Sequence, residues 1–272
     1  MPHGVTVAWR GSGAGRSPTW PGSASSTTPG WSGANLRGAS EEVLDALARA
    51  LQLDEAERAH LLDLARAAGP AARARRRPGR PHVSAHLQHL LDAMTGAPAF
   101  VRNGRLDLLA ANALARALYS PVFEGHPEPV NLARFCFLDP RAELFYPEWE
   151  EAADTTVALL RTEAGRDPYD KDLIDLVGEM STRSEDYRGR WAAHEVRLHR
   201  SGAKQFTHPV VGRLDLNFEA FPVASDSRLT LIAYTAPPGS PSADALALLA
   251  SYAATQARSA THDRLTSAPD PF

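Results

Sequence analysis

The chain has 272 residues, 43% hydrophobic and 22% charged, which allows one large domain or two modest ones and does not indicate wholesale disorder. Its formal charge of −3 argues against a uniformly basic nucleic-acid binder, although not against a local basic patch. The single cysteine, Cys136, excludes an internal disulfide framework, and no run approaches the roughly 18 apolar residues of a membrane span. We therefore expect a cytoplasmic protein with no membrane partner.

The first 39 residues form a segment of unusual composition. They hold eight of the 19 glycines and three of the five tryptophans, but no aspartate or glutamate. Neither the two-residue period of a strand nor the 3.6-residue period of a helix is present, and there is no apolar region typical of a signal peptide. We therefore predict a disordered tail over residues 1–39, with a charge of +3.

Two short amphipathic helices are predicted over residues 40–68. Ser40 is a good N-cap, and apolar residues recur from Leu44 at helical spacing. Asp54 and Glu57 have the spacing of a capping box at the start of the second helix. A helical hairpin of this size cannot bury a stable core alone, so we expect it to be a fragment of a larger unit.

Residues 69–83 are predicted to be a basic linker, because they contain Arg75, Arg76 and Arg77 and have no apolar face. Two interpretations remain open at this point. The segment is either a solvated hinge or a group of phosphate contacts beside a DNA-binding unit.

Residues 84–258 are predicted to form an α+β domain, followed by a disordered tail over 259–272. The helices are expected at 84–95, 112–119, 131–137, 148–163, 171–181 and 186–193, with a closing helix from about 240. Strands 99–102 and 105–110 are joined at Asn103–Gly104, which suits a type I′ turn. The later strands are 196–200 and 204–208, on either side of a Ser201–Gly202 turn, then 213–221 and 228–235. This order predicts a five-stranded antiparallel sheet with flanking helices, an arrangement that commonly encloses a cavity.

Several polar and aromatic side chains of this domain are candidates for lining a ligand cavity. They are Asn112, Arg134, Phe135, Tyr146, Trp149, Arg188, Trp191, His194 and His208. Each also has a structural interpretation: a helix cap for the asparagine, ion pairs with acids such as Glu185 for the arginines, and core packing for the aromatic rings. For His208 the alternative is a hydrogen-bonded structural histidine.

No metal, cofactor or catalytic residue is expected. His82, His86 and His89 are spaced to share one helical face, but no fourth zinc ligand is evident, which favours exposed polar positions. Cys136 lies between two phenylalanines, as a buried apolar residue does, rather than in the setting of a nucleophile. The sequence has no G-x-S-x-G, P-loop or H-E-x-x-H motif, so we do not expect an enzyme.

Five separated strings carry a family resemblance: 105–112, 131–135, 147–149, 184–191 and 204–212. In order and spacing they resemble the ligand-binding domain of the MmyB-like transcription regulators of actinobacteria, over about 98–249. The resemblance implies a PAS-like domain, a small ligand with fatty acids among the candidates, and an N-terminal Xre/Cro-type helix-turn-helix. Residues 40–68 resemble the last two helices of that five-helix unit. One departure is Ala111, where the family usually has a tryptophan.

At the position where the family would have the first three helices of that DNA-binding unit, this chain has the tail 1–39. Read one base earlier, with G or C favoured at third codon positions, Trp20–Ala34 can be back-read as LAGVSVEYYTRLERG. This string resembles the family's recognition-helix region, and residue 35 onwards continues in frame. We hypothesise that residues 1–34 come from an out-of-frame reading.

The sequence leaves two functions open. One is a ligand-responsive DNA-binding transcriptional regulator, for which the resemblance implies a homodimer on paired half-sites and DNA contacts from Arg37, Arg75, Arg76 and Arg77. The other is a sensor or interaction module that has lost DNA binding because its reading helices are missing.

Overall fold

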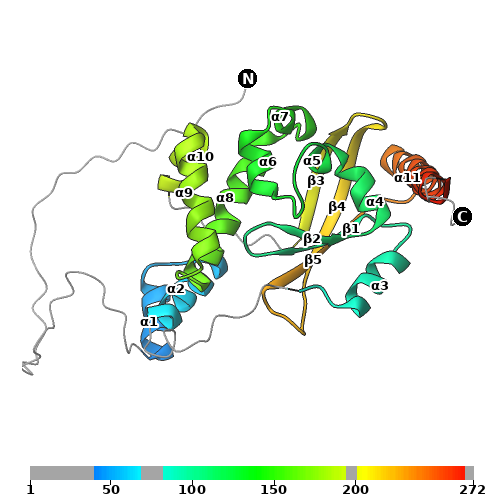
Figure 1. Ribbon diagram of the computed structural model, residues 1–272. Coiled ribbons are helices and arrows are strands. Elements are labelled where there is room, and N and C mark those ends of the chain that lie inside the picture. Colours follow the sequence, from blue (N-terminus) through cyan, green and yellow to red (C-terminus); the bar gives the residue numbers. More distant parts are fainter. Residues whose placement is uncertain (1–39, 69–81, 194–200, 267–272) are drawn as a thin grey trace, which may run out of the picture. The chain divides into compact units, whose positions relative to one another are not determined.

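The computed structural model describes residues 40–68, 82–193 and 201–266 (Figure 1). The chain divides into two units, 1–35 and 36–272, and the whole of the first lies outside the described residues. The predicted helices at 40–68 are present as α1 (Glu41–Ala50) and α2 (Glu55–Ala68). Their predicted caps form as well: the Ser40 hydroxyl accepts from Val43 N. Asp54 N donates to Glu57 Oε2 over 2.9 Å, and Glu57 N donates to Asp54 Oδ1 over 2.8 Å.

The rest of the described chain is the predicted α+β domain with a five-stranded antiparallel sheet, in the order β2-β1-β5-β4-β3. Its strands are β1 (Ala99–Asn103), β2 (Leu108–Ala111), β3 (Ser201–His208), β4 (Gly212–Pro222) and β5 (Leu229–Thr235). Its helices are α3 (Ala85–Ala93), α4 (Ala113–Leu118), α5 (Ser120–Phe123), α6 (Leu132–Leu138), α7 (Arg141–Phe145), α8 (Trp149–Arg166), α9 (Lys171–Arg183), α10 (Glu185–Ala193) and α11 (Pro241–Thr266). Helix α11 therefore continues past the expected boundary at 258.

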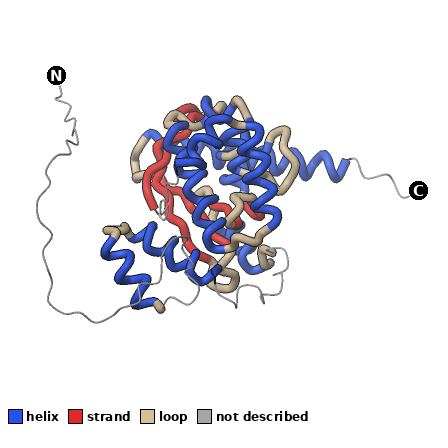
Figure 2. Tube along the Cα trace, turned by 90° about the vertical axis from the view of Figure 1, so that its left-hand side faces the viewer, coloured by secondary structure: helices blue, strands red, loops and turns tan. Residues whose placement is uncertain are grey.

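The two faces of the sheet are buried against different partners. Phe100, Leu216 and Tyr234 belong to one cluster with residues of α4 to α8 and α11. Val101 and Leu231 point the other way and pack against Leu91 of α3. Side chains alternate along a strand, so a polar residue two positions from a core residue also faces the helices. Figure 2 shows the helices covering one side of the strands.

The prediction of a two-residue turn at Asn103–Gly104 is wrong, although β1 and β2 do pair as a hairpin. Strand β1 ends at Asn103 and β2 begins at Leu108, and Leu106, not Gly104, has a positive φ, of 68°. Leu106 is 2% exposed in a cluster with α8 and α9. Burial of its side chain therefore favours this longer loop over a two-residue turn. Asn103 Nδ2 donates to Asp107 Oδ2 over 2.8 Å, and Asp107 N donates to Asn103 Oδ1 over 3.0 Å, which closes the loop at its base.

The turn predicted at Ser201–Gly202 is also wrong, because both residues belong to β3 and pair with Glu219 and Phe218 of β4. The Phe218 ring explains the glycine: a Cβ at position 202 would lie 3.1 Å from Cε1 of that ring. The strand predicted over 196–200 lies outside the described residues.

Candidate functional site

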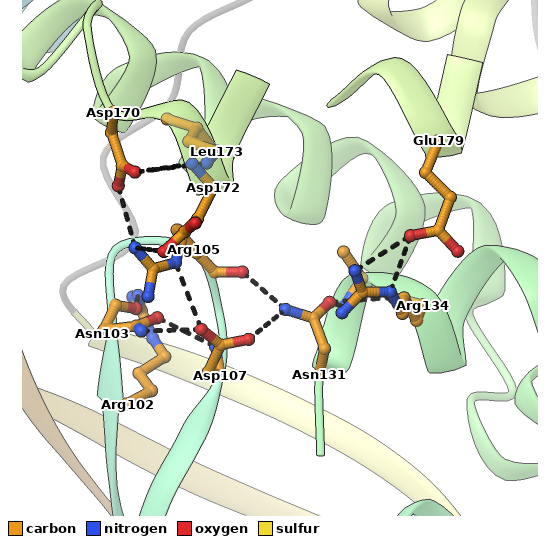
Figure 3. Close-up of polar contacts among 11 residues, drawn as sticks. Arg102, Asn103, Arg105, Asp107, Asn131, Arg134, Asp170, Asp172, Leu173 and Glu179 are labelled. Carbon is orange, nitrogen blue, oxygen red and sulfur yellow. Dashed lines mark hydrogen bonds and ion pairs between the residues drawn. The ribbon is translucent and has the colours of Figure 1, made fainter. Parts of the chain in front are cut away.

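A polar network joins the β1–β2 loop to α6 and α9 (Figure 3). Asn131 stands at its centre and caps α6, since its Oδ1 accepts from Ala133 N and Arg134 N, both over 3.0 Å. Its Nδ2 donates to Arg105 O and to Asp107 Oδ1, both over 2.8 Å. All four bonds of the Asn131 amide are therefore used to fix the loop against the helix.

Arg105 and Arg134 extend this network to α9. The Arg105 guanidinium lies 3.3 Å from Asp107 and 3.0 Å from Asp170. Burial lowers the pKa of Arg105, but these two carboxylates outweigh it and raise the pKa above its ordinary value. Arg134 is paired with Glu179 over 2.9 Å. Both guanidiniums are therefore already held by carboxylates.

Several of these side chains line a surface hollow of about 450 Å³, the polar hollow. Its lining residues are Asn103, Arg105, Asp107, Leu109, Pro129, Arg134, Asp172, Asp175, Leu176 and Glu179. The four carboxylates exceed the two guanidiniums, so the hollow repels an anion and has little apolar surface for a fatty chain.

The aromatic core between the sheet and the helices has the opposite character. Lys204 of β3 faces it from the same side as Phe206, and its Nζ lies 4.6 Å from the Tyr146 ring centre and 5.8 Å from that of Phe206. Within the described chain, no carboxylate forms an ion pair with this ammonium group. Burial lowers the pKa of Lys204 to about 8, with Arg102 adding to the effect while Cys136 and Glu151 oppose it.

Arg102 is a second cation on this side of the sheet. It is 8% exposed, and its Nη1 donates to Asn103 O over 3.2 Å. No ion pair joins it to a carboxylate among the described residues. Burial lowers its pKa to about 10, with Glu163 and then Tyr234 offsetting part of the effect.

Arg102 is buried and Lys204 is half-buried, and neither has a paired carboxylate among the described residues. Both are costly, because a cation that loses hydration needs an anion to compensate. Around them lie aromatic rings and the hydrogen-bonded hydroxyls of Tyr119 and Tyr234, 2.6 Å apart. This interior therefore offers positive charge beside apolar rings, which suits a ligand with an acidic head and an apolar body. We call Lys204, Arg102 and the rings of Tyr119, Tyr146, Phe206 and Tyr234 the interior site.

The sequence did not single out Lys204 or Arg102. The signal for Lys204 was its spacing, since Lys204, Phe206 and His208 alternate onto one face of a strand. For Arg102 the signal was similar: it stands two residues after Phe100. That neither cation has an ion pair with a carboxylate of the described residues is a tertiary property, which spacing along the chain does not contain.

Three of the aromatic candidates come together at the interior site: Tyr146 belongs to it, and Phe135 and Trp149 lie beside it. Phe135 and Tyr146 are buried with ring centres 6.0 Å apart. Trp149 packs against the same cluster and donates from Nε1 to Cys136 O over 2.9 Å. Trp191 lies elsewhere, stacked on Tyr187 with ring centres 5.7 Å apart.

The polar candidates are separated from one another. Asn112 caps α4 as its structural interpretation predicts, with Oδ1 accepting from Ala115 N over 2.8 Å. Arg134 lines the polar hollow, whereas exposed Arg188 donates to Ser181 O over 3.3 Å. His194, Arg37, Arg75, Arg76 and Arg77 lie outside the described residues.

His208 is 2% exposed and fully engaged in hydrogen bonds to its own domain. Its Nδ1 accepts from Val210 N over 3.2 Å and from Val211 N over 3.4 Å. Nε2 therefore carries the proton and donates to Ala117 O over 2.9 Å. These contacts tie β3 to α4 and describe a structural histidine.

Acidification is expected to destabilise the protein through His208. Burial lowers its pKa below 6.5, so the unfolded chain binds the proton more readily and stability falls as the pH drops below about 6.5. Protonation would also place a donor at Nδ1 against two backbone N–H groups. Urea unfolding between pH 7.5 and pH 5 should show this loss, and His208→Gln should remove part of it; an unchanged slope in the variant would contradict the assignment.

The remaining sequence candidates behave as isolated residues. His82, His86 and His89 are exposed, and no group of metal-binding side chains occurs in the described part of the chain. Cys136 is buried, and burial raises the pKa of its thiol to about 11. None of the described helices is long and apolar enough to cross a membrane.

Comparison with known proteins adds one finding. Residues 83–249 match the family model described as the MmyB-like transcription regulator ligand binding domain. This span contains all five strands and both cations of the interior site. The chain has no match among curated proteins.

Proposed function

The chain belongs to the family of MmyB-like transcription regulator ligand-binding domains, and we propose that it is a regulator that senses a small organic acid at the interior site. The observation that carries the proposal is the half-buried Lys204, whose ammonium group lies against aromatic rings with no carboxylate of the described chain paired to it. A ligand carboxylate would supply the missing anion through a charge-assisted hydrogen bond. The surrounding rings would contact an apolar, fatty-acid-like body.

The charges of the two candidate sites favour this choice. The polar hollow has more carboxylates than cations, and each of its arginines is already paired, so an acid would bind there without a free partner. The interior site has positive charge in excess. A ligand carboxylate would therefore gain most where Lys204 and Arg102 lie.

DNA is the proposed partner of the regulator, bound by a homodimer on paired half-sites. Helices α1 and α2 support this, since they form a capped hairpin on the N-terminal side of the family domain, where the resemblance implies a DNA-binding unit. The second candidate is a sensor module without DNA binding. It is favoured by the composition of residues 1–34, which lacks the acids and helical spacing of a recognition helix.

A gel-shift experiment separates the two candidates. We expect a version with the restored reading frame over 1–34 to shift DNA fragments from around its own gene at low salt, and to lose affinity steeply as salt rises. The chain as given should not shift them. An equal shift by both forms would show that the segment 1–34 is not needed for DNA binding and would contradict the out-of-frame hypothesis.

A further inference from the structure

Helix α2 packs closely against the C-terminal turn of α8. The imidazole of His60 lies directly on the buried Gly165, where any Cβ would overlap the ring. Beside it, Arg166 Nε lies 3.9 Å from Asp63 Oδ2. Helix α2 of the α1–α2 hairpin thus contacts one turn of α8 through close packing on its backbone and through an ion pair.

The same turn of α8 also faces the β1–β2 loop. The carboxyl group of Glu163 packs against Gly104, leaving no room for a side chain there. Burial raises the pKa of Glu163, although Arg166 and Arg102 each oppose the shift. Arg102, a member of the interior site, donates to Asn103 O beside Gly104, so Arg102 and the Glu163 carboxyl group meet the same loop.

Arg166 stands between two carboxylates on different elements. Its Nη1 lies 3.4 Å from Glu163 Oε2, and its Nε is the atom that approaches Asp63 of α2. Both contacts are made at once, through different nitrogens, and both are long, so a movement of Arg166 toward one carboxylate lengthens its distance to the other. The outcome depends on how much of the charge of Glu163 is balanced from the other side by Arg102.

We propose that the last turn of α8 transmits occupancy of the interior site to the α1–α2 hairpin. An anion bound at Arg102 takes over its positive charge, Glu163 then draws Arg166 away from Asp63, and α2 is released from Gly165. The ligand step of this proposal rests on the proposed function. The competition between Glu163 and Asp63 for Arg166 does not, because it needs no ligand.

Two substitutions with opposite expected effects test the competition without any ligand. Arg102→Gln removes the charge that a bound anion would neutralise, so hydrogen exchange of the α2 amides should increase several-fold. Glu163→Gln removes the carboxylate that competes with Asp63 for Arg166. The ion pair with Asp63 should strengthen, and the same amides should exchange more slowly. The amides of β4 serve as the internal control for global stability. Unchanged α2 exchange in both variants would overturn the proposal.

The ligand step is tested with dodecanoate as the probe. Saturating dodecanoate should increase α2 exchange in the natural chain, by roughly fivefold or more for a typical coupling, and should leave it unchanged in Glu163→Gln. If dodecanoate does not bind at all, the proposed ligand class is wrong. The exchange rates of Arg102→Gln and Glu163→Gln still test whether Glu163 and Asp63 compete for Arg166. Dodecanoate binding that leaves α2 exchange unaltered would overturn transmission alone.

Glycine substitutions provide a matched pair for the docking contact itself. Gly165→Ala should release α2, and by reciprocity should tighten dodecanoate binding by roughly fivefold. Gly178→Ala, at an exposed position of α9, gains the same helix propensity with nothing nearby to overlap, and should change neither property. Adding His60→Ala to Gly165→Ala should restore docking, because it removes the overlapping ring. Full α2 protection in Gly165→Ala would contradict the assigned contact.

Discussion

Replacing Lys204 with methionine is expected to stabilise the ligand-free protein while removing its preference for an acid. Methionine keeps the apolar stem of the half-buried lysine but removes an ammonium group that lies against Tyr146 without a paired carboxylate in the described chain. Apolar replacement of poorly compensated buried charge commonly gains about 1–4 kcal/mol, so urea unfolding should show an increase of this order. Lys171, the other lysine, is exposed on α9, and Lys171→Met should leave stability unchanged.

Ligand binding should change in the opposite direction. A buried charge-assisted hydrogen bond contributes about 1.5–3 kcal/mol, so Lys204→Met should bind dodecanoate at least about tenfold more weakly. Dodecanol has the same apolar body without the charge and should bind both forms alike. Calorimetric titration of the two ligands into the natural chain, Lys204→Met and Lys171→Met measures this difference. Equal loss of acid and alcohol affinity would show a packing defect instead of a lost anion contact.

The pH dependence gives the same prediction an independent readout. The folded pKa of Lys204 is about 8 and the ordinary value is 10.5, so between these the unfolded chain holds the proton and the folded chain does not. Stability of the natural chain relative to Lys204→Met should therefore rise between about pH 8 and 10.5. The affinity for dodecanoate should fall over the same range because the ammonium group is lost. A difference that does not vary with pH would contradict a half-buried, charged Lys204.

Asn112→Ala is expected to destabilise the domain by about 3 kcal/mol or more. The Oδ1 of Asn112 accepts from Ala115 N and, over 3.2 Å, from Ala99 N. Its Nδ2 donates to Met94 O over 2.7 Å and to Ala97 O over 2.8 Å. Alanine would remove the cap of α4 and leave buried backbone groups of β1 and the preceding loop unpaired, each at a cost of about 1–3 kcal/mol.

Thermal and urea unfolding measure this effect. A loss of this size is a large fraction of the stability of an ordinary domain, so a reduced yield of folded protein is also expected. Asn217→Ala provides the control, since Asn217 is exposed on β4 and should change stability by no more than about 0.5 kcal/mol. Similar small losses in both variants would mean that the Asn112 bonds are not what joins α4 to β1.

Features with local causes were predictable from the sequence. Ser40, Asp54 and Asn112 cap helices because a short side chain reaches backbone N–H groups a few residues ahead, and this requires no tertiary information. The sheet was predictable because β4 alternates buried and exposed residues over most of its length. The family domain followed from several separated strings that keep their order and spacing.

Features set by distant contacts were not predictable. The β1–β2 loop departs from the expected tight turn because Leu106 is anchored in a helical cluster formed by later residues. The pairing of Arg105 with Asp170 joins positions 65 residues apart. The charge of the interior site depends on which carboxylates fail to reach Lys204 and Arg102, and spacing along the chain does not contain that information.

A crystal structure of the chain with dodecanoate is the decisive test of the interior site. We expect density for the ligand between the sheet and the helices, with its carboxylate within about 3 Å of Lys204 Nζ. Dodecanoate bound in the hollow lined by Arg105 and Arg134, or in the interior with its carboxylate directed away from Lys204 and Arg102, would contradict it.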